Sequence, residues 1–308
     1  MTKRRLGRSE LFIEPMVFGC NVLGWTLDEA DAGKVLDAFL DGGFNAFDTA
    51  DTYGKGKSET ILGNWIKARG NRDKVLVFTK VGSDMGQGHR DLSARWIAEE
   101  VDASLKRLQT DFIDLYQTHW PDPNTAQEET LEALDRTVKA GKVRVIGSSN
   151  QDTALLTEAL AISKAKGFAR YETIQNEFNL YDREGFGEVQ ATCVKEEVSG
   201  IGYFSLARGF LAGKYRSAAD ATKSQRGKNV VDKYLNEKGF RILAALDAAA
   251  KSNNATQAEV ALAWINAQPG VAAPIASATS VEQAMSLIKG ARLVLPAADL
   301  AALTEAGG

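Results

Sequence analysis

The sequence predicts a (β/α)8 barrel of the TIM type, with an N-terminal β-hairpin and extra helices near the C-terminus. Short apolar runs alternate along the chain with segments of helical periodicity. After the hairpin this alternation gives eight strands, each followed by a helical pattern. No Pro/Ser-rich linker or change of composition divides the 308 residues, so we expect one domain over residues 1–308.

The elements follow in chain order. Residues 7–13 indicate a small hairpin or plug, and residues 16–19 the first buried strand. Asp28 stands in the position of a helix N-cap, and Gly42 with Gly43 ends that helix. A polar, Gly- and Lys-containing segment at residues 217–236 interrupts the alternation. The other strands are expected at residues 44–48, 75–80, 112–117, 143–147, 171–176, 200–206 and 271–276. The helices are expected at residues 28–41, 58–70, 91–108, 125–140, 155–165, 188–198, 238–250, 256–267 and 281–289.

The main rival is a doubly wound parallel sheet that binds a dinucleotide. That fold requires a Gly-x-Gly-x-x-Gly turn directly after a strand. The nearest candidate, formed by Gly82, Gly86 and Gly88, has the wrong spacing. The barrel is therefore favoured.

Composition narrows the classes of partner. The net charge is −3 and no Lys/Arg-rich run is present, so nucleic acid and anionic membrane surfaces are not indicated. No apolar run approaches the roughly 18 residues needed to span a bilayer. The two cysteines are far apart and the N-terminus has no apolar signal-peptide segment, so we expect a reduced, cytoplasmic setting. Small molecules are the expected partners.

The candidate site lies at the strand ends. In a barrel of this kind, chemistry gathers at the carboxyl ends of the strands. Asp48 ends the second strand with Tyr53 in the loop behind it, Lys80 ends the third, and His119 follows the fourth. Each of these residues alone also has a structural interpretation as a turn, rim or surface residue. Together they form a set whose chemistry is coherent.

That chemistry is proton donation to a carbonyl group. A tyrosine phenol has an unperturbed pKa of about 10, and a neighbouring ammonium favours the phenolate and lowers that pKa. Lys80 could supply the ammonium, Asp48 its counter-ion, and a neutral His119 a hydrogen bond to a carbonyl oxygen. With no nucleophile and no metal, the set suits carbonyl reduction by an external hydride donor.

Other barrel chemistries fit less well. His89 and His119 are the only histidines, so a hydrolase built on several histidine ligands is disfavoured and no metal site is expected. A glycosidase needs two carboxyl groups at strand ends, whereas Asp114 lies inside its strand. A Schiff-base aldolase using Lys80 stays open, although it leaves the amide and hydroxyl groups on the later strands unexplained.

Six segments carry a resemblance to a known family. They are FDTADTYG (47–54), DFIDLYQTHWPD (111–122), VRVIGSSN (143–150), IQNEFNLYDR (174–183), YFSLARGFLAGK (203–214) and PIASATSVEQ (274–283). Over essentially the entire chain the sequence resembles the aldo-keto reductase superfamily. The resemblance implies that Tyr53 is the general acid, His119 polarises the carbonyl, Lys80 tunes Tyr53, and Asp48 pairs with Lys80.

The resemblance also implies a bound nicotinamide dinucleotide and a carbonyl pocket. The residues implied at the nicotinamide are Ser149, Asn150 and Gln175, which bind its carboxamide, and Tyr203, which stacks on its ring. Those implied along the pyrophosphate are Leu206, Arg208, Gly209 and Lys214. Those implied around the adenosine are Ser277, Thr279, Ser280 and Gln283. Those implied in the wall of the carbonyl pocket, besides Tyr53, are Trp25, Trp120 and Met85.

The sequence departs from the family pattern in the last segment. Ser280 stands where the family usually places an Arg or Lys for the 2′-phosphate of NADP, and Leu287 where it often has Asn. A cation from Lys223, Arg226 or Lys228 could take that place. The expected cofactor is NADP(H), with NAD(H) as the alternative. Ser148, Gln151 and Phe178 are further departures, and we expect them to be tolerated.

We therefore expect an NAD(P)(H)-dependent enzyme that interconverts an aldehyde or ketone with its alcohol. The alternative is a regulatory barrel that senses the nucleotide and turns over little, as auxiliary channel subunits resembling this family do. The substrate, the preferred direction and the oligomeric state are not assigned.

Overall fold

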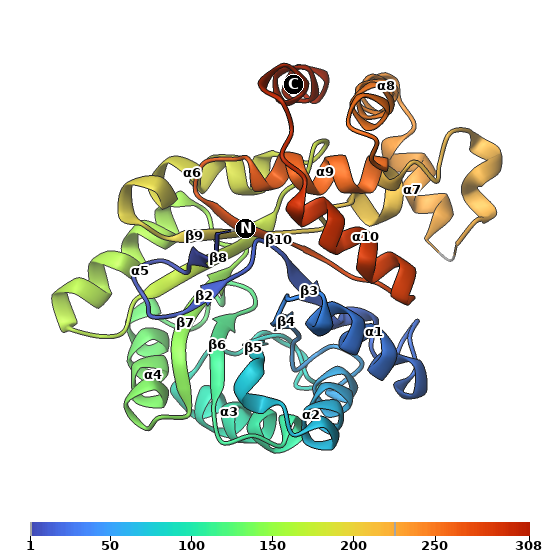
Figure 1. Cartoon of the computed structure of the whole chain (residues 1–308). Helices are drawn as coiled ribbons and strands as arrows, with labels where there is room; N and C mark the ends of the chain where they lie inside the picture. The colour runs from blue at the N-terminus through green and yellow to red at the C-terminus, as the bar shows by residue number, and fades with distance from the viewer. Residues whose placement is uncertain (1, 225) are drawn as a thin grey trace.

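The structure is a computed structural model that describes residues 2–224 and 226–308. Within these residues, eight parallel strands close into a barrel in the order β10-β3-β4-β5-β6-β7-β8-β9 (Figure 1). Their bounds are β3 (Val17–Gly19), β4 (Ala46–Asp48), β5 (Leu76–Val81), β6 (Ile113–Thr118), β7 (Val143–Ser149), β8 (Tyr171–Glu177), β9 (Ser199–Tyr203) and β10 (Val271–Ala276). The prediction of a (β/α)8 barrel is confirmed.

Helices surround the barrel, and further helices follow β9 and β10 (Figure 1). They are α1 (Glu29–Asp41), α2 (Lys57–Arg69), α3 (Ala94–Leu108), α4 (Gln127–Lys139), α5 (Thr153–Lys166), α6 (Glu184–Glu196), α7 (Gly227–Tyr234), α8 (Glu237–Ser252), α9 (Gln257–Asn266), α10 (Val281–Arg292) and α11 (Ala297–Ala306). In the described part of the chain, none of them has the length and apolar character needed to cross a membrane.

Helix starts follow the capping chemistry, and the starts of α3 and α6 differ most from the sequence expectation. Asp28 caps α1 as predicted, since its side chain accepts a hydrogen bond from the Asp31 amide. Helix α3 begins at Ala94 rather than at residue 91, because Ser93 is its cap. Helix α6 begins four residues earlier than expected, at Glu184. The segment 217–236, apart from Gln225, which lies outside the described residues, contains η4 (Ala218–Thr222) and α7.

The N-terminal hairpin closes the amino end of the barrel. Strands β1 (Arg4–Arg5) and β2 (Phe12–Ile13) pair in antiparallel fashion. Leu6, Leu11 and Ile13 are buried, and they belong to one apolar cluster with residues of all eight barrel strands except β8. The predicted hairpin or plug is therefore confirmed, and any entrance to the barrel interior lies at the carboxyl end.

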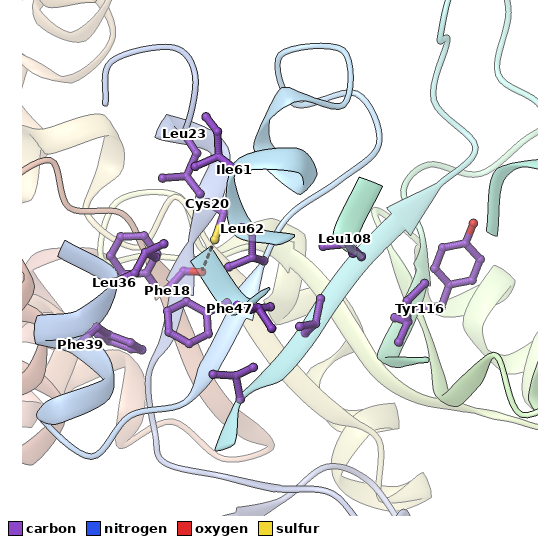
Figure 2. Packing of buried hydrophobic residues seen from close by; sticks show 14 of the residues in the cluster. Phe18, Cys20, Leu23, Leu36, Phe39, Phe47, Ile61, Leu62, Leu108 and Tyr116 are labelled. Atoms are coloured by element: carbon purple, nitrogen blue, oxygen red, sulfur yellow. Dashed lines mark hydrogen bonds between the residues drawn. The ribbon is translucent and has the colours of Figure 1, made fainter. Parts of the chain in front are cut away.

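Aromatic packing holds β3 and β4 against their helices. Phe39 of α1 lies 5.4 Å from the Phe18 ring and 5.6 Å from the Phe47 ring, both in edge-on contact. Figure 2 shows these rings with Leu36 of α1 and Leu62 of α2 around them. Burying each such side chain stabilises the fold by about 2 kcal/mol. This packing fixes the strand from which the 48–53 loop leaves the barrel.

The barrel interior changes character along the strands. Successive side chains of a strand point to opposite faces, so every second residue faces inward. The lower interior, next to the hairpin, is apolar and includes Ala46 and Phe78. Two residues further along the same strands come Asp48 and Lys80. The strand period thus places buried polar groups directly above an apolar layer at the carboxyl end.

Candidate active site

The centre of the site is the ion pair between Asp48 and Lys80. The Lys80 ammonium donates to Asp48 Oδ2 at 2.5 Å and to the Thr49 carbonyl at 2.8 Å. It lies 3.4 Å from the hydroxyl of Tyr53. The Lys80 side chain is fully buried. Asp48, Lys80 and Tyr53 therefore form one connected series, which ends in a phenol.

Two amides orient the Asp48 carboxylate. Gln175 of β8 donates to Asp48 Oδ1 at 2.9 Å, and Gln117 of β6 donates to the same oxygen at 3.2 Å. Gln175 also donates to Gln117 at 3.1 Å, so the two amides are linked. The family resemblance implies a cofactor contact for Gln175, whereas Gln117 was not singled out from the sequence. The signal for Gln117 was its inward position on β6, where it pairs in register with Lys80.

The loop that carries Tyr53 is fixed at several points. The amide of Thr49 donates to the Phe78 carbonyl at 2.8 Å, and Thr49 Oγ1 lies 2.8 Å from Ser58 Oγ. Ser58 in turn donates to the carbonyl of Cys20, and its own amide donates to the Tyr53 carbonyl. These contacts join the loop to β5, to α2 and to the segment after β3. Tyr53 therefore has a defined position at the barrel mouth.

The electrostatic balance differs from the expectation for Tyr53. Burial raises the pKa of Tyr53, and the opposing influence of Lys80 does not cancel this increase. Burial alone would lower the pKa of Lys80, but the Asp48 carboxylate and the Tyr53 hydroxyl outweigh it and the net shift is upward. The expected lowering of the Tyr53 pKa is thus not present in this state. The group is a neutral phenol beside a charged ammonium, which is the form needed by a proton donor.

His119 faces the same region from the end of β6. Its ring centre lies 5.8 Å from that of Tyr53, nearly perpendicular to it. Its amide donates to the Val81 carbonyl at 2.8 Å, and Nδ1 lies 3.0 Å from Ser83 Oγ. Burial lowers the pKa of His119 well below its usual value, and the charges of Lys80 and Arg90 act in the same direction. The imidazole is therefore neutral at physiological pH.

A cavity of about 520 Å³ opens above these groups. The sequence-predicted site residues that line it are Asp48, Tyr53, His119, Trp120, Ser149, Asn150, Gln175, Tyr203, Leu206, Arg208, Gly209, Lys214, Ser277 and Gln283. Lys80 lies beneath Asp48 and Tyr53 and reaches the cavity through them. Side chains from seven of the eight strand ends and their loops thus meet around one space, although they are scattered along the sequence.

The cavity continues along the segment after β9, where the backbone is strained. Phe204, Ala207 and Arg208 have left-handed φ angles of 50°, 46° and 57°, which non-glycine residues seldom adopt. Gly209 follows at 95°. Such conformations cluster at ligand sites, where successive amides can turn toward one concave surface. With Lys214 nearby in the same wall, this segment combines backbone donors and cations.

Besides Lys80, four predicted residues lie outside the cavity lining. Ser280 caps α10, where its side chain accepts from the Gln283 amide, and Thr279 is exposed and donates to the Gln283 side chain. Trp25 is half exposed, and the Arg226 guanidinium lies 4.2 Å above its ring. Met85 lies in the loop between β5 and α3. Their cofactor and substrate contacts stay predictions.

The lining also contains residues that the sequence did not single out. Asn21 follows the first barrel strand and accepts from the Ser277 hydroxyl at 2.6 Å. Its position, directly after an inner strand, was the available signal. Ser286 lies one helical turn beyond Gln283 on α10, and that spacing could have identified it. Arg226, named only as one of three cations that could bind the 2′-phosphate, is the one of the three in the lining.

Metal ligation has no support from the side-chain arrangement. Within residues 2–224 and 226–308, no group of three or more His, Cys, Asp or Glu side chains is placed to hold a metal ion. Cys20 and Cys193 are both buried and unpaired with each other. The polar groups of the cavity lining are amides, hydroxyls, the imidazole of His119, the Asp48 carboxylate and the cations of Arg208, Lys214 and Arg226.

Comparison with known proteins agrees with this geometry. The sequence model named Aldo/keto reductase family matches residues 15–307. The chain is 35% identical to the uncharacterized oxidoreductase YrpG of Bacillus subtilis, over 94% of this chain and 91% of that protein. It is 37% identical to the aldo-keto reductase YhdN of the same organism, over 79% and 73%. It is 30% identical to a probable voltage-gated potassium channel subunit beta of Arabidopsis thaliana, over 96% and 92%. The resemblance found in the sequence is thereby confirmed, and the chain belongs to the aldo/keto reductase family.

Proposed function

We propose that the protein interconverts an aldehyde or ketone with its alcohol, with Tyr53 as the general acid and base. Family membership supports NAD(P)H-dependent oxidoreduction of carbonyls in general. The observation that carries the finer proposal is the series Asp48, Lys80 and Tyr53, which ends at the cavity beside a neutral His119. The hydroxyl of Tyr53 is not needed to hold the 48–53 loop, because contacts of Thr49 and Ser58 already fix that loop. This favours a chemical role for the phenol.

The lining fits a nicotinamide dinucleotide. Ser149 and Asn150 are hydrogen-bonding groups at the end of β7, close to Tyr53 and His119 in the same lining. Tyr203 donates to Asn150 at 2.7 Å, which sets its ring at the cavity wall, where a planar nicotinamide could stack. Arg208, Lys214 and the strained backbone after β9 suit a pyrophosphate. When bound, the nicotinamide supplies the hydride.

The protein groups would act on the carbonyl oxygen and on the proton. Nε2 of the neutral His119 would donate a hydrogen bond to the carbonyl oxygen as negative charge develops there. Tyr53 would donate its proton to that oxygen, a step that contributes about 10² to 10⁴ in rate. Lys80 then stabilises the phenolate that remains, and Asp48 keeps the ammonium in place. In the reverse direction the phenolate accepts the proton from the alcohol.

We propose NADP(H) as the preferred cofactor, with Arg226 in place of the missing cation at position 280. Of the three cations considered, Lys223 pairs with Asp220 at 2.8 Å and Lys228 with Asp232 at 2.7 Å. Arg226 instead lines the cavity, and burial followed by the charge of Arg208 lowers its pKa. Repulsion from the neighbouring Arg208 favours an anionic partner for the Arg226 guanidinium, such as the extra phosphate of NADP(H).

The test is rapid-mixing measurement of hydride transfer. The protein is saturated with NADPH and mixed with a panel of aldehydes and ketones, and oxidation of the bound cofactor is followed by its absorbance. The proposal expects oxidation within one turnover for at least one carbonyl class, with weaker binding of NADH in parallel titrations. Uniform failure with saturated cofactor would favour the nucleotide-sensing barrel, a possibility suggested by the relative named as a channel subunit.

A further inference from the structure

Ser83 contacts the His119 imidazole from the segment that follows β5. Ser83 follows β5 in the short segment Gly82-Ser83-Asp84, and the residue is 8% exposed. Its hydroxyl lies 3.0 Å from Nδ1 of His119. We propose that Ser83 donates this hydrogen bond and so fixes the His119 tautomer that carries its proton on Nε2, which makes Ser83 a positioning residue for the carbonyl reaction. The inference rests on the proposed role of His119.

The direction of the hydrogen bond follows from proton accounting. A neutral imidazole has one N–H donor and one bare nitrogen, and its partner decides which nitrogen keeps the proton. Among the described residues, Nδ1 of His119 is the one hydrogen-bond partner of the Ser83 hydroxyl. A largely buried hydroxyl that did not donate there would leave its proton without an acceptor in the protein, which is unfavourable. The Ser83 hydroxyl therefore donates and Nδ1 accepts.

The tautomer decides whether His119 can assist the reaction. With Nδ1 bare, the proton lies on Nε2, which has no partner among the residues that the structure describes and belongs to a ring that lines the cavity. This N–H can donate to a carbonyl oxygen. In the other tautomer, Nε2 would present a lone pair to the carbonyl oxygen and repel it. Protonation of both nitrogens is opposed by burial and by the neighbouring cations.

The segment that carries Ser83 is preformed. Asp84 Oδ1 accepts from the amides of Gly86 and Gly88 at 2.8 and 3.0 Å, and Gln87 donates to the Ser83 carbonyl at 3.1 Å. Gly82 has a φ of +100°, and a Cβ there would lie 2.3 Å from a methyl group of Leu92. The loop is thus closed by its own hydrogen bonds and by a position that requires glycine.

His119 is held independently of Ser83. Its amide donates to the Val81 carbonyl, and its carbonyl accepts from Asn150 at 2.9 Å. The Trp120 ring is stacked 6.0 Å from its ring. Loss of the Ser83 hydroxyl should therefore leave the imidazole in place and change chiefly where its proton lies. This separates the proposal from a general role in packing.

The tautomer can be read directly by nuclear magnetic resonance. Long-range proton–nitrogen correlation spectra of ¹⁵N-histidine-labelled full-length protein distinguish the two neutral forms, with and without NADP⁺. Only His89 and His119 contribute, and the exposed His89 is assigned with His89→Gln. We expect the Nε2–H form for His119 in the wild type. In Ser83→Ala we expect a rise of the Nδ1–H form, and in Ser83→Thr, which keeps the hydroxyl, the wild-type form.

Kinetics supply the second measurement. Ser83→Ala should lower kcat about 10-fold, as expected for one hydrogen bond, with the dissociation constant of NADPH unchanged. Ser83→Thr should restore most of the loss. A wild-type His119 in the Nδ1–H form, or Ser83→Ala with unchanged tautomer and unchanged kcat, would overturn the proposal.

The spectra also separate this proposal from the proposed function. The tautomer of the wild-type protein is measured without turnover, so it decides the Ser83 contact even if no carbonyl is reduced. Should Ser83→Ala fail to fold, the wild-type spectrum and Ser83→Thr still decide. Conversely, full activity of His119→Ala would contradict the proposed role of His119 while leaving the direction of the Ser83 hydrogen bond as measured.

Discussion

Asp48 and Asp114 are two buried carboxylates that pair with cations, but only the Asp48 pair is connected to a titratable group in the cavity lining. Asp48 and Asp114 both lie on barrel strands and both are almost fully buried. Asp114 accepts from Arg72 at 2.7 Å, from Arg144 at 2.8 Å and from the Val77 amide at 2.9 Å. Asp48 accepts from Lys80 and from two glutamine amides. By burial and pairing alone the two would be ranked alike.

The two carboxylates differ in the groups to which their cations are connected. The Asp114 cluster lies near the amino end of β6, its cations are arginines that reach the surface, and none of its members is in the cavity lining. Lys80, the cation of the Asp48 pair, is completely buried and contacts the hydroxyl of Tyr53, and Tyr53 lines the cavity. A buried ion pair therefore indicates a reaction site when a third titratable group connects it to a cavity.

The largest expected effect comes from Lys80→Met. The phenolate that forms when Tyr53 donates its proton would lose its counter-charge, so kcat should fall by at least about 10²-fold. The variant also leaves Asp48 buried without a cation, which should lower the stability. Steady-state kinetics and urea unfolding separate the two effects.

A double variant, Lys80→Met with Asp48→Asn, is the matched control. It removes both charges, so we expect stability to recover while turnover stays low. Recovered turnover would mean that the ion pair is structural, as at Asp114, and would remove the contrast between the two clusters.

Asp114→Asn should affect stability alone. The change leaves Arg72 and Arg144 without their carboxylate, and Arg144 is half exposed and can be solvated again. We expect the free energy of unfolding to fall by about 3 kcal/mol, the lower end for breaking a buried pair, with kcat of the folded enzyme unchanged. Urea unfolding and active-site titration measure both quantities. A reduced kcat with intact folding would contradict the separation of the two regions.

Arg226→Ala extends the comparison to the cofactor end of the cavity. A lost charge-assisted contact to a 2′-phosphate should raise the KM for NADPH about 10-fold and leave that for NADH unchanged. Lys228→Ala is the control, because that side chain is exposed and paired with Asp232. Equal changes with both cofactors would show that Arg226 does not bind the extra phosphate.

The smallest effect concerns pH. His119 has a pKa well below 6.5, so it stays neutral as the pH rises through that value, and Tyr53 has a pKa above 10, so it stays a phenol until alkaline pH. The reduction rate, kcat/KM, should therefore show no titration between about pH 6 and pH 9. Alcohol oxidation needs the phenolate and should accelerate with rising pH. A reduction profile with a midpoint near 6.5 would assign a charged role to His119.

The sequence predicted most of the fold, because the strand and helix periods and the capping residues are local signals. The eight strands and the plug are where these signals place them, and Asp28 caps its helix as expected. The start of α6 was missed by four residues, because its N-cap position is occupied by Arg183, which gives no capping signal. Arg226 lines a cavity formed by strand ends that are distant in sequence, and local periodicity cannot predict such a contact.

The grouping of the site residues could be predicted in part from the sequence, whereas their electrostatic balance and side-chain contacts could not. Strand ends in a closed barrel converge, so Asp48, Lys80 and His119 could be grouped from their positions. The sign of the Tyr53 pKa shift could not be predicted from the sequence, because it depends on the balance between burial of the phenol and the charge of Lys80. Gln117 contacts Asp48 and Ser83 contacts His119 through side chains from neighbouring strands and loops, and such contacts cannot be located without coordinates. Ser280 caps α10, a contact that the sequence did not indicate, and its cofactor contact stays a prediction.

The most direct test of the central claim is hydride transfer in Tyr53→Phe. The substitution keeps the ring and removes only the hydroxyl that lies 3.4 Å from Lys80. In a single turnover with saturating NADPH and a reactive carbonyl, we predict that cofactor oxidation slows by at least about 10²-fold while the dissociation constant of NADPH stays the same. Oxidation at the wild-type rate would contradict the account, because it would show that the series from Asp48 to Tyr53 supplies no proton to the reaction.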